Sequence, residues 1–195
     1  MFVVGGDGDG FSIGGGHLPH AARRNPDITY MIIDNGIYGL TKGQVSPTSP
    51  MGMVSGTTPF GLEDPPLDPL PMLLSYGVSF VARGFSSDVK QVSKLVQAAV
   101  AHPGFSIVHL VSPCPTFNQV ITFDFMKERV SPISEDHDPT DIAAAFRLAL
   151  NQERFYTGVF YRNPNLPTME QKLEHQRKLT MDRQPRSLEQ LFAQF

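Results

Sequence analysis

Glycines surround two aspartates directly after a short apolar run near the start of the chain. Residues 2–4 are typical of the end of a buried strand, and they lead into Gly5-Gly6-Asp7-Gly8-Asp9-Gly10. Glycine lets the backbone approach a ligand closely, and a following helix start offers free N–H groups to an anion. A carboxylate would repel a phosphate at this point unless a divalent cation lay between them. Because Mg²⁺ takes oxygen ligands and usually keeps phosphate oxygens among them, Asp7 is a candidate Mg²⁺ ligand.

A second apolar run ends in another polar turn. Residues 28–33 read as a strand, and Asp34-Asn35-Gly36 follows directly. If the two strands are joined by a right-handed crossover, their carboxyl ends lie at the same edge of a parallel sheet. Asp7 and Asn35 would then face each other across a crevice. The alternative is two ordinary turns, because Asp-Gly and Asn-Gly are common turn pairs.

The motifs at these two turns resemble those of a known family. Gly6-Asp7-Gly8 followed by Asn35 is similar to the thiamine diphosphate motif. The wider match consists of Gly6-Asp7-Gly8-Asp9, Arg23-Arg24-Asn25-Pro26-Asp27-Ile28, Asn35-Gly36-Ile37-Tyr38-Gly39-Leu40-Thr41-Lys42-Gly43-Gln44 and Ser112-Pro113-Cys114-Pro115-Thr116-Phe117-Asn118. Together these segments resemble the β subunit of 2-oxoacid:ferredoxin oxidoreductases, with the 2-oxoglutarate enzyme as the nearest member. The resemblance runs from residue 3 to about residue 125, and more loosely to about residue 168.

The resemblance implies thiamine diphosphate and Mg²⁺ as cofactors. Asp7 and Asn35 would supply side-chain oxygens to Mg²⁺, and Ile37 would supply its carbonyl oxygen. The implied cofactor-binding residues are Gly6, Asp7, Gly8, Asp9, His17, Asn35, Ile37, Gly39 and Leu40. For His17, a solvated histidine at a helix start is an equal alternative, and Gly16 stands where the family often has asparagine.

The turn Asp34-Asn35-Gly36-Ile37 is called the metal turn below. The loop that follows it is expected to lie beside the reacting groups. In the resembling enzymes Leu40, Thr41 and Lys42 lie by the thiazolium and the 2-oxoacid. The ammonium group of Lys42 could pair with the distal carboxylate of 2-oxoglutarate. Without the family, a single loop lysine would be read as solvated.

Cys114 is the only cysteine and lies between two prolines after an apolar run. A lone cysteine is usually a small core residue. The resemblance instead implies one thiolate ligand of a [4Fe–4S] cluster, which normally takes four cysteines. The family's β subunits are longer at the front, where the other ligands would lie. We therefore expect an N-terminally truncated chain that is inactive by itself.

The resemblance also implies a reaction and its partners. The expected activity is oxidative decarboxylation of 2-oxoglutarate to succinyl-CoA and CO₂, with coenzyme A as acyl acceptor and ferredoxin as electron acceptor. An α subunit is the expected partner, in an αβ or (αβ)₂ assembly. One alternative is a non-oxidative thiamine diphosphate-dependent decarboxylase or synthase, which would need no cluster. Another is a non-catalytic remnant that only binds a partner subunit.

Composition narrows the remaining possibilities. The 195 residues carry a formal net charge of −3 and no basic run, which argues against general nucleic-acid binding. No apolar stretch approaches the length of a membrane span, and no signal peptide is evident. A single cysteine cannot form an internal disulfide, which fits a cytoplasmic location.

The apolar pattern predicts an α/β fold with a parallel sheet flanked by helices, the diphosphate-binding half of a thiamine enzyme. Strands are expected at 2–4, 28–33, 78–82, 105–111 and 159–161. Helices are expected at 17–24, at 68–75, from Ser86 or Ser87 to about residue 101, and at 139–150. Residues 36–67 and 119–130 are predicted as loops. A cofactor domain at 1–135 would precede a C-terminal unit at 136–195, whose residues 168–183 form a surface arm.

Overall fold

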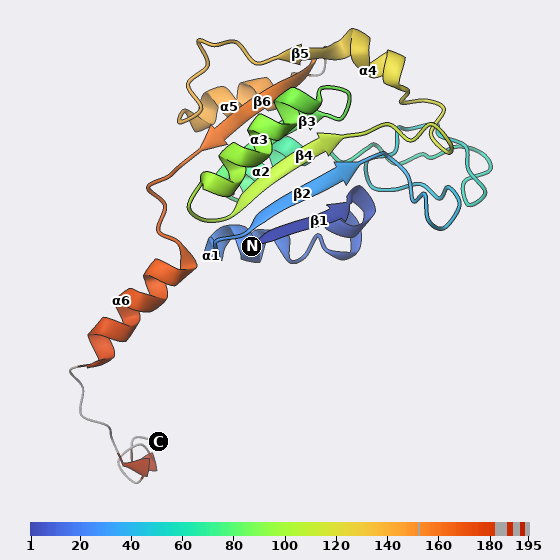
Figure 1. Ribbon diagram of the computed structural model, residues 1–195. Coiled ribbons are helices and arrows are strands. Elements are labelled where there is room, and N and C mark those ends of the chain that lie inside the picture. Colours follow the sequence, from blue (N-terminus) through green and yellow to red (C-terminus); the bar gives the residue numbers. More distant parts are fainter. Residues whose placement is uncertain (152, 182–186, 189–191, 194–195) are drawn as a thin grey trace.

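A six-stranded sheet in the order β1-β2-β4-β3-β6-β5 forms the middle of the structure (Figure 1). The structure is a computed structural model that describes residues 1–151, 153–181, 187–188 and 192–193. Its strands are β1 (Phe2–Gly6), β2 (Thr29–Asp34), β3 (Phe80–Phe85), β4 (Ser106–Val111), β5 (Val130–Pro132) and β6 (Phe155–Arg162).

Strands β1, β2, β4 and β3 are parallel, so their carboxyl ends lie at one edge of the sheet, here called the carboxyl edge. Strand β6 is antiparallel to β3, and β5 is parallel to β6. The predicted α/β fold with helices flanking the sheet is confirmed, with a sheet that is mostly rather than wholly parallel. The antiparallel pairing of β3 with β6 brings the C-terminal part of the chain into the same sheet.

Helices cover both faces of the sheet because side chains alternate between the faces along each strand. Helix α3 (Val89–Ala101) packs on one face, where Leu95 and Ala99 share a core with Val108. The opposite face is covered by α1 (Leu18–Arg24), α2 (Pro69–Ser75) and α5 (Ile142–Ala149). The core on this second face includes Leu18, Ile32, Leu73, Val81, Ile107, Ala145 and Phe160.

Asn25 ends helix α1 and ties three parts of the chain together. It adopts a left-handed conformation with a φ of 56°, and it is fully buried. Its amide oxygen accepts hydrogen bonds from Phe105 N at 2.7 Å and from Ser79 Oγ at 2.8 Å. Its amide nitrogen donates to the carbonyls of Leu166 and Pro167. The start of the C-terminal arm is therefore fixed at the amino end of the strands, away from the carboxyl edge.

Two local predictions differ from the structure. The segment expected as a plain connection at 119–130 contains helix α4 (Phe123–Arg129), whose first turn is capped by Thr122 accepting from Phe125 N at 3.2 Å. Helix α3 is capped by Asp88, which accepts from Gln91 N at 3.0 Å, and not by Ser86 or Ser87. Asp88 suits this position because its carboxylate accepts from a free N–H at the positive end of the helix.

Helix α6 (Met169–Met181) extends away from the sheet and buries none of its residues (Figure 1). It occupies most of the predicted surface arm, whose residues 182 and 183 lie outside the described part of the chain. Among the helices of the described residues, none combines the length and the apolar character needed to cross a membrane.

Candidate functional site

The turns that follow β1 and β2 lie side by side at the carboxyl edge. The two strands pair in register from Phe2 and Thr29 to Gly6 and Ile33, so the next residues of each strand emerge together. The backbone N–H of Asn35 donates to Asp7 Oδ1 at 3.4 Å. The structure thus brings the side chain of Asp7 to the backbone of Asn35, the two residues that the sequence singled out, although they are 28 residues apart along the chain.

Asp7 is almost fully buried and shares one hydroxyl with a second carboxylate. Thr48 Oγ1 lies 2.9 Å from Asp7 Oδ2 and 2.7 Å from Asp34 Oδ1. A hydroxyl has one proton to donate, so it cannot satisfy both carboxylates at once. Burial, followed by the nearby charge of Asp34, raises the pKa of Asp7 above its usual range. Both causes disfavour the ionised carboxylate of Asp7, and a cation bound at this point would offset them, as expected of a metal ligand.

Asp34 is supported from behind by a buried histidine. Its Oδ2 lies 2.7 Å from His109 Nε2, and its Oδ1 accepts from Gly36 N at 3.0 Å. Burial alone would raise the pKa of Asp34, but the hydrogen bonds from His109, Thr48 and Gly36 outweigh it and lower that pKa. Asp34 is consequently the carboxylate that stays ionised in this pair.

Arg83 lies on the other side of His109 and is the first member of a series of buried hydrogen bonds that leads to Asp34. Its Nε donates to His109 Nδ1 at 3.2 Å, and its guanidinium stacks over Phe155 and Phe160. Burial lowers the pKa of Arg83 to about 10, and Asp68, 3.9 Å away, opposes that shift. The guanidinium thus remains positively charged at neutral pH inside the core.

The oxygen atoms at the paired turns suit a hard divalent cation. Asn35 Oδ1 accepts from Ile37 N at 3.0 Å, which shapes the turn that carries the Ile37 carbonyl. The donor set would be the carboxylate of Asp7, the amide oxygen of Asn35 and a backbone carbonyl, the ligands that Mg²⁺ takes in proteins. Within the described residues, no group of three or more His, Cys, Asp or Glu could hold a metal by itself. Phosphate oxygens or water would have to complete the coordination.

Glycine is required at two positions around these turns. A Cβ on Gly8 would lie 2.1 Å from the ring of Tyr38, whose hydroxyl donates to the Gly8 carbonyl at 3.3 Å. Gly36 has a φ of 64°, and a Cβ there would lie 2.9 Å from Asn118 Nδ2. The carboxylate of Asp9 accepts from Gly6 N at 2.9 Å, so in this structure it closes the glycine turn. A short π-helical turn, η1 (Asp9–Ile13), then continues the chain.

The predicted substrate loop forms a tight turn at the surface. Tyr38 N donates to Gln44 O at 2.9 Å, and Gly43 N donates back to Tyr38 O at 2.9 Å. Between them, the side chains of Leu40, Thr41 and Lys42 are exposed, and Lys42 has a φ of 74°. These three residues therefore lie in an exposed turn close to the metal turn in sequence, and their proposed roles remain predictions.

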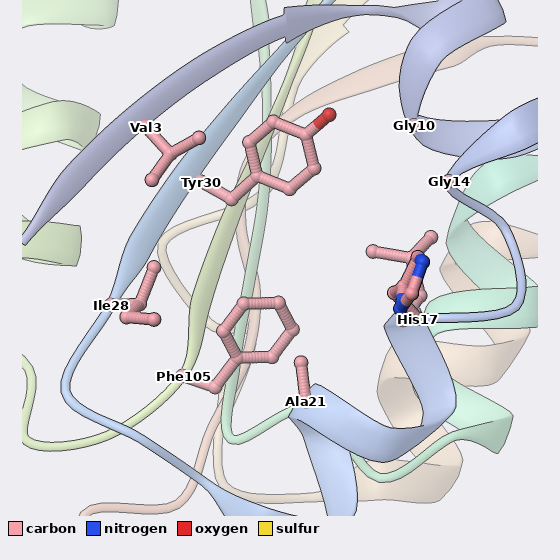
Figure 2. Close-up of a pocket in the computed structure, with 9 residues that line it drawn as sticks. Val3, Gly10, Gly14, His17, Ala21, Ile28, Tyr30 and Phe105 are labelled. Carbon is pink, nitrogen blue, oxygen red and sulfur yellow. The ribbon is translucent and has the colours of Figure 1, made fainter.

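His17 lies at a different place from the paired turns. It precedes α1 and lines an apolar cavity of about 250 Å³, together with Val3, Tyr30 and Phe105 among others. Figure 2 shows the side chains of β1 and β2 on one side of this cavity and His17 with the backbone of Gly10 and Gly14 on the other. Asp7 and Asn35 do not line it. The structure therefore does not group His17 with the two metal-turn residues, and its contact with a diphosphate remains a prediction.

Cys114 lies in the turn that directly follows β4 at the carboxyl edge. Its thiol is free and half-buried, and its carbonyl accepts from Asn118 N at 3.1 Å. The side chain of the buried Asn118 donates to the carbonyl of Asn35 at 3.0 Å. One cysteine does not make a [4Fe–4S] site, which takes four thiolates, so the other ligands would have to come from outside this chain.

Five residues of this region received no role from the sequence: Asp34 and Asn118, which lie within the quoted motifs, and Thr48, Arg83 and His109. For two of them a signal was available, because Arg83 and His109 are polar residues inside strands that are otherwise apolar. Thr48 lies in a long segment without periodicity, so nothing local distinguished it from its neighbours.

Two family models match successive parts of the chain. Residues 1–110 match the C-terminal thiamine pyrophosphate-binding domain of thiamine pyrophosphate enzymes, which places this fold and its paired turns in that class of protein. Residues 114–178 match the C-terminal part of the β subunit of pyruvate ferredoxin oxidoreductase.

Among thiamine pyrophosphate enzymes, this chain is similar to individual 2-oxoacid:ferredoxin oxidoreductases. A 2-oxoacid:ferredoxin oxidoreductase subunit β of Saccharolobus solfataricus is 34% identical over 95% of this chain, and a 2-oxoglutarate oxidoreductase subunit KorB of Mycobacterium tuberculosis is 44% identical over 66%. The chain spans 65% of the first relative and 34% of the second. A solved 2-oxoglutarate:ferredoxin oxidoreductase from Magnetococcus marinus, with 2-oxoglutarate, coenzyme A and succinyl-CoA bound, is 45% identical with a TM-score of 0.90, over 99% of this chain and 67% of that one. The chain belongs to the family of 2-oxoacid:ferredoxin oxidoreductase β subunits.

Proposed function

We propose that this chain is the thiamine diphosphate-binding part of a cytoplasmic 2-oxoglutarate:ferredoxin oxidoreductase. In the assembled enzyme, 2-oxoglutarate and coenzyme A would give succinyl-CoA and CO₂, and two electrons would pass to ferredoxin. An α subunit would complete the active site in an αβ or (αβ)₂ assembly. The similarity to the Magnetococcus marinus enzyme, which holds 2-oxoglutarate and succinyl-CoA, supports this choice of substrate.

The pairing of Asp7 with the turn of Asn35 is the observation that carries the proposal. Asp7 is a buried carboxylate that accepts from the backbone N–H of Asn35, in a turn that also carries the Asn35 amide oxygen and the Ile37 carbonyl. These oxygen types suit Mg²⁺ that also binds a diphosphate. In this role Asp7, Asn35 and the carbonyl of Ile37 would hold the cation. Gly8 would let the backbone approach the diphosphate, because its Cα carries no side chain.

Thiamine diphosphate, when bound, supplies the carbanion chemistry that permits decarboxylation of a 2-oxoacid. The chain's own residues would orient it: the metal turn holds the diphosphate end, and Leu40, Thr41 and Lys42 lie on the loop that leaves this turn. We propose Lys42 as the cation that faces the distal carboxylate of 2-oxoglutarate. Cys114 would contribute one thiolate to a [4Fe–4S] cluster whose other ligands lie outside this chain.

The test uses the complete β subunit purified with its α partner. Calorimetry should show binding of thiamine diphosphate in the presence of Mg²⁺ and none in excess EDTA. With coenzyme A and a viologen dye, 2-oxoglutarate should reduce the dye and yield succinyl-CoA. Formation of succinic semialdehyde without dye reduction would instead identify a non-oxidative decarboxylase. Absence of Mg²⁺-dependent binding of thiamine diphosphate would overturn the proposal.

A further inference from the structure

A continuous chain of buried hydrogen bonds leads from the core to the metal turn. It begins at the guanidinium of Arg83, passes through His109 to Asp34, and divides there between the N–H of Gly36 and the hydroxyl of Thr48. Thr48 in turn contacts Asp7 at 2.9 Å. Arg83 and His109 lie opposite each other on β3 and β4, and their side chains are 7% and 3% exposed.

The partners of the histidine determine where its proton lies. An arginine Nε–H is always a donor, so His109 Nδ1 must accept from Arg83. The remaining ring proton is therefore on Nε2, and it points at Asp34 Oδ2, 2.7 Å away. The edge of the imidazole also contacts the ring of Phe11, with 6.1 Å between the ring centres. The ring is thus held at both nitrogen atoms and packed against a buried aromatic side chain.

Fixing Asp34 fixes the two groups that shape the metal turn. Its Oδ1 accepts both from Gly36 N, inside the turn that carries Asn35 and Ile37, and from the hydroxyl of Thr48. Without the donor from His109, Asp34 Oδ2 would lose its partner, and the carboxylate would be held only through Oδ1, by the two contacts that it is meant to position. Outer-shell groups of this kind orient the ligands of metal sites.

We infer that His109, oriented by Arg83, is a positioning residue that holds Asp34, and through it the turn of Asn35 and the hydroxyl at Asp7, in the geometry that binds the cation. The inference rests on the proposed Mg²⁺–thiamine diphosphate site and adds to it a support that reaches across two strands of the sheet. His109 hydrogen-bonds to Arg83 and Asp34, so it would act on the cation only through Asp34.

Two amide substitutions of His109 differ in reach and therefore in the partner that they keep. In His109→Gln the amide nitrogen can take the place of Nε2 and still donate to Asp34. In His109→Asn the side chain can pair with Arg83 but stops short of Asp34. His109→Asn should weaken Mg²⁺-dependent binding of thiamine diphosphate by about 10- to 100-fold, as loss of an outer-shell partner does. His109→Gln should stay within about threefold of the unaltered protein if the donor to Asp34 is what matters.

The measurement is calorimetric titration of thiamine diphosphate into the assembled enzyme at fixed Mg²⁺, at a temperature where every variant is folded. The electron paramagnetic resonance spectrum of Mn²⁺ in place of Mg²⁺ gives a second readout, which should broaden in His109→Asn and not in His109→Gln. His102→Asn is the matched control: His102 is also buried, but it contacts Ser79 before β4 begins, away from the carboxyl edge. That variant should lose stability and keep its cofactor affinity.

If His109→Asn does not fold, Asp34→Asn tests the same chain from the acceptor side, because it keeps the shape and removes one acceptor. It should show the same loss of affinity. Unchanged affinity in His109→Asn, or in Asp34→Asn where the first variant is not folded, would reduce His109 to a packing residue and overturn the inference. Failure of the unaltered enzyme to bind thiamine diphosphate with Mg²⁺ would overturn the proposed function itself.

Discussion

The side-chain amide of Asn118 donates a hydrogen bond to the carbonyl of Asn35 at 3.0 Å and thereby joins two turns that are 83 residues apart. Its amide oxygen accepts from the backbone N–H groups of Val120 and Ile121, and its own N–H donates to the carbonyl of Cys114. Asn118 is 1% exposed. One buried side chain thus fixes the cysteine turn against the metal turn.

Asn118→Ala should destabilise the protein because it leaves three backbone groups without their partners. A buried group that loses its hydrogen bond costs about 1–3 kcal/mol, so a loss in the free energy of unfolding of at least about 2 kcal/mol is expected. Urea unfolding monitored by circular dichroism is the measurement. Gln119→Ala serves as control, because Gln119 is exposed and its amide contacts only the carbonyl of Pro115. Equal stabilities for the two variants would contradict the bridging role.

Asp7→Asn should have opposite effects on cofactor binding and on stability without metal. The amide keeps an oxygen for Asn35 N, while its nitrogen can donate to Thr48, whose proton then goes to Asp34. In the variant each contact of Thr48 Oγ1 therefore has its own proton, whereas in the unaltered protein two carboxylates compete for the single hydroxyl proton. In EDTA its free energy of unfolding should equal or exceed that of the unaltered protein by about 0.5–1.5 kcal/mol, the usual net value of one hydrogen bond.

In Mg²⁺ the same Asp7→Asn variant should no longer bind thiamine diphosphate, because the anionic metal ligand is gone. Chemical unfolding with and without Mg²⁺ and thiamine diphosphate measures both effects on one sample. A variant that is destabilised in EDTA would show that Asp7 is a structural carboxylate, and retained Mg²⁺-dependent binding would remove it from the metal site.

The sequence predicted the positions of Asp7 and Asn35 in the candidate site, but it did not predict that of Thr48. Asp7 and Asn35 each follow a short apolar strand directly, and parallel strands bring such positions to one edge whatever the intervening chain does. Thr48 reaches Asp7 from a long loop through the turn of Ser46 and Ser49, and only tertiary contacts place it there. The contact between Thr48 and Asp7 could not be predicted from the local sequence.

The burial of helix residues and the direction of a strand also depend on tertiary contacts that the sequence pattern does not predict. Apolar residues recur at helical spacing along α3, and of these Leu95 and Ala99 are buried, whereas Val89 and Val100 are 72% and 56% exposed. At about 100° per residue, Val89 and Val100 lie on the same flank of the apolar face, and periodicity carries no information about how far around the helix the cover by the sheet extends. The antiparallel direction of β6 likewise depends on the path of the chain through α5, which no strand pattern records.

Acid should weaken the fold through His102. Burial, and then the charge of Arg162, lower the pKa of His102 below its usual value near 6.5. The unfolded chain therefore binds more protons than the folded one below about pH 6.5, and stability falls as the pH decreases. Urea midpoints at pH 7.5 and pH 5.5 should differ less in His102→Gln than in the unaltered protein. Phe80→Leu disturbs the ring packed against His102 but keeps the histidine, so it should keep the original pH dependence.

Lys42→Gln should change the choice of substrate more than the overall activity. It keeps a polar side chain, one atom shorter than lysine, and removes the charge that we propose faces the distal carboxylate of 2-oxoglutarate. Loss of a charge-assisted hydrogen bond of about 1.5–3 kcal/mol corresponds to a decrease of roughly tenfold or more in kcat/KM for 2-oxoglutarate. Pyruvate has no distal carboxylate, so its kcat/KM should change little. Equal losses for both substrates, measured with a viologen acceptor, would assign Lys42 to support of the loop.

The anchorage of the C-terminal arm at Asn25 has a consequence for how this protein can diverge. The arm is attached at the amino end of the strands, whereas the metal turn, the cysteine turn and the buried chain behind them lie at the other end. Substitutions along the exposed helix α6 therefore leave the contacts of Asp7 and Asn35 unchanged. Lineages can therefore exchange the residues of the exposed arm while the arrangement of the turns at the opposite end of the sheet is inherited intact.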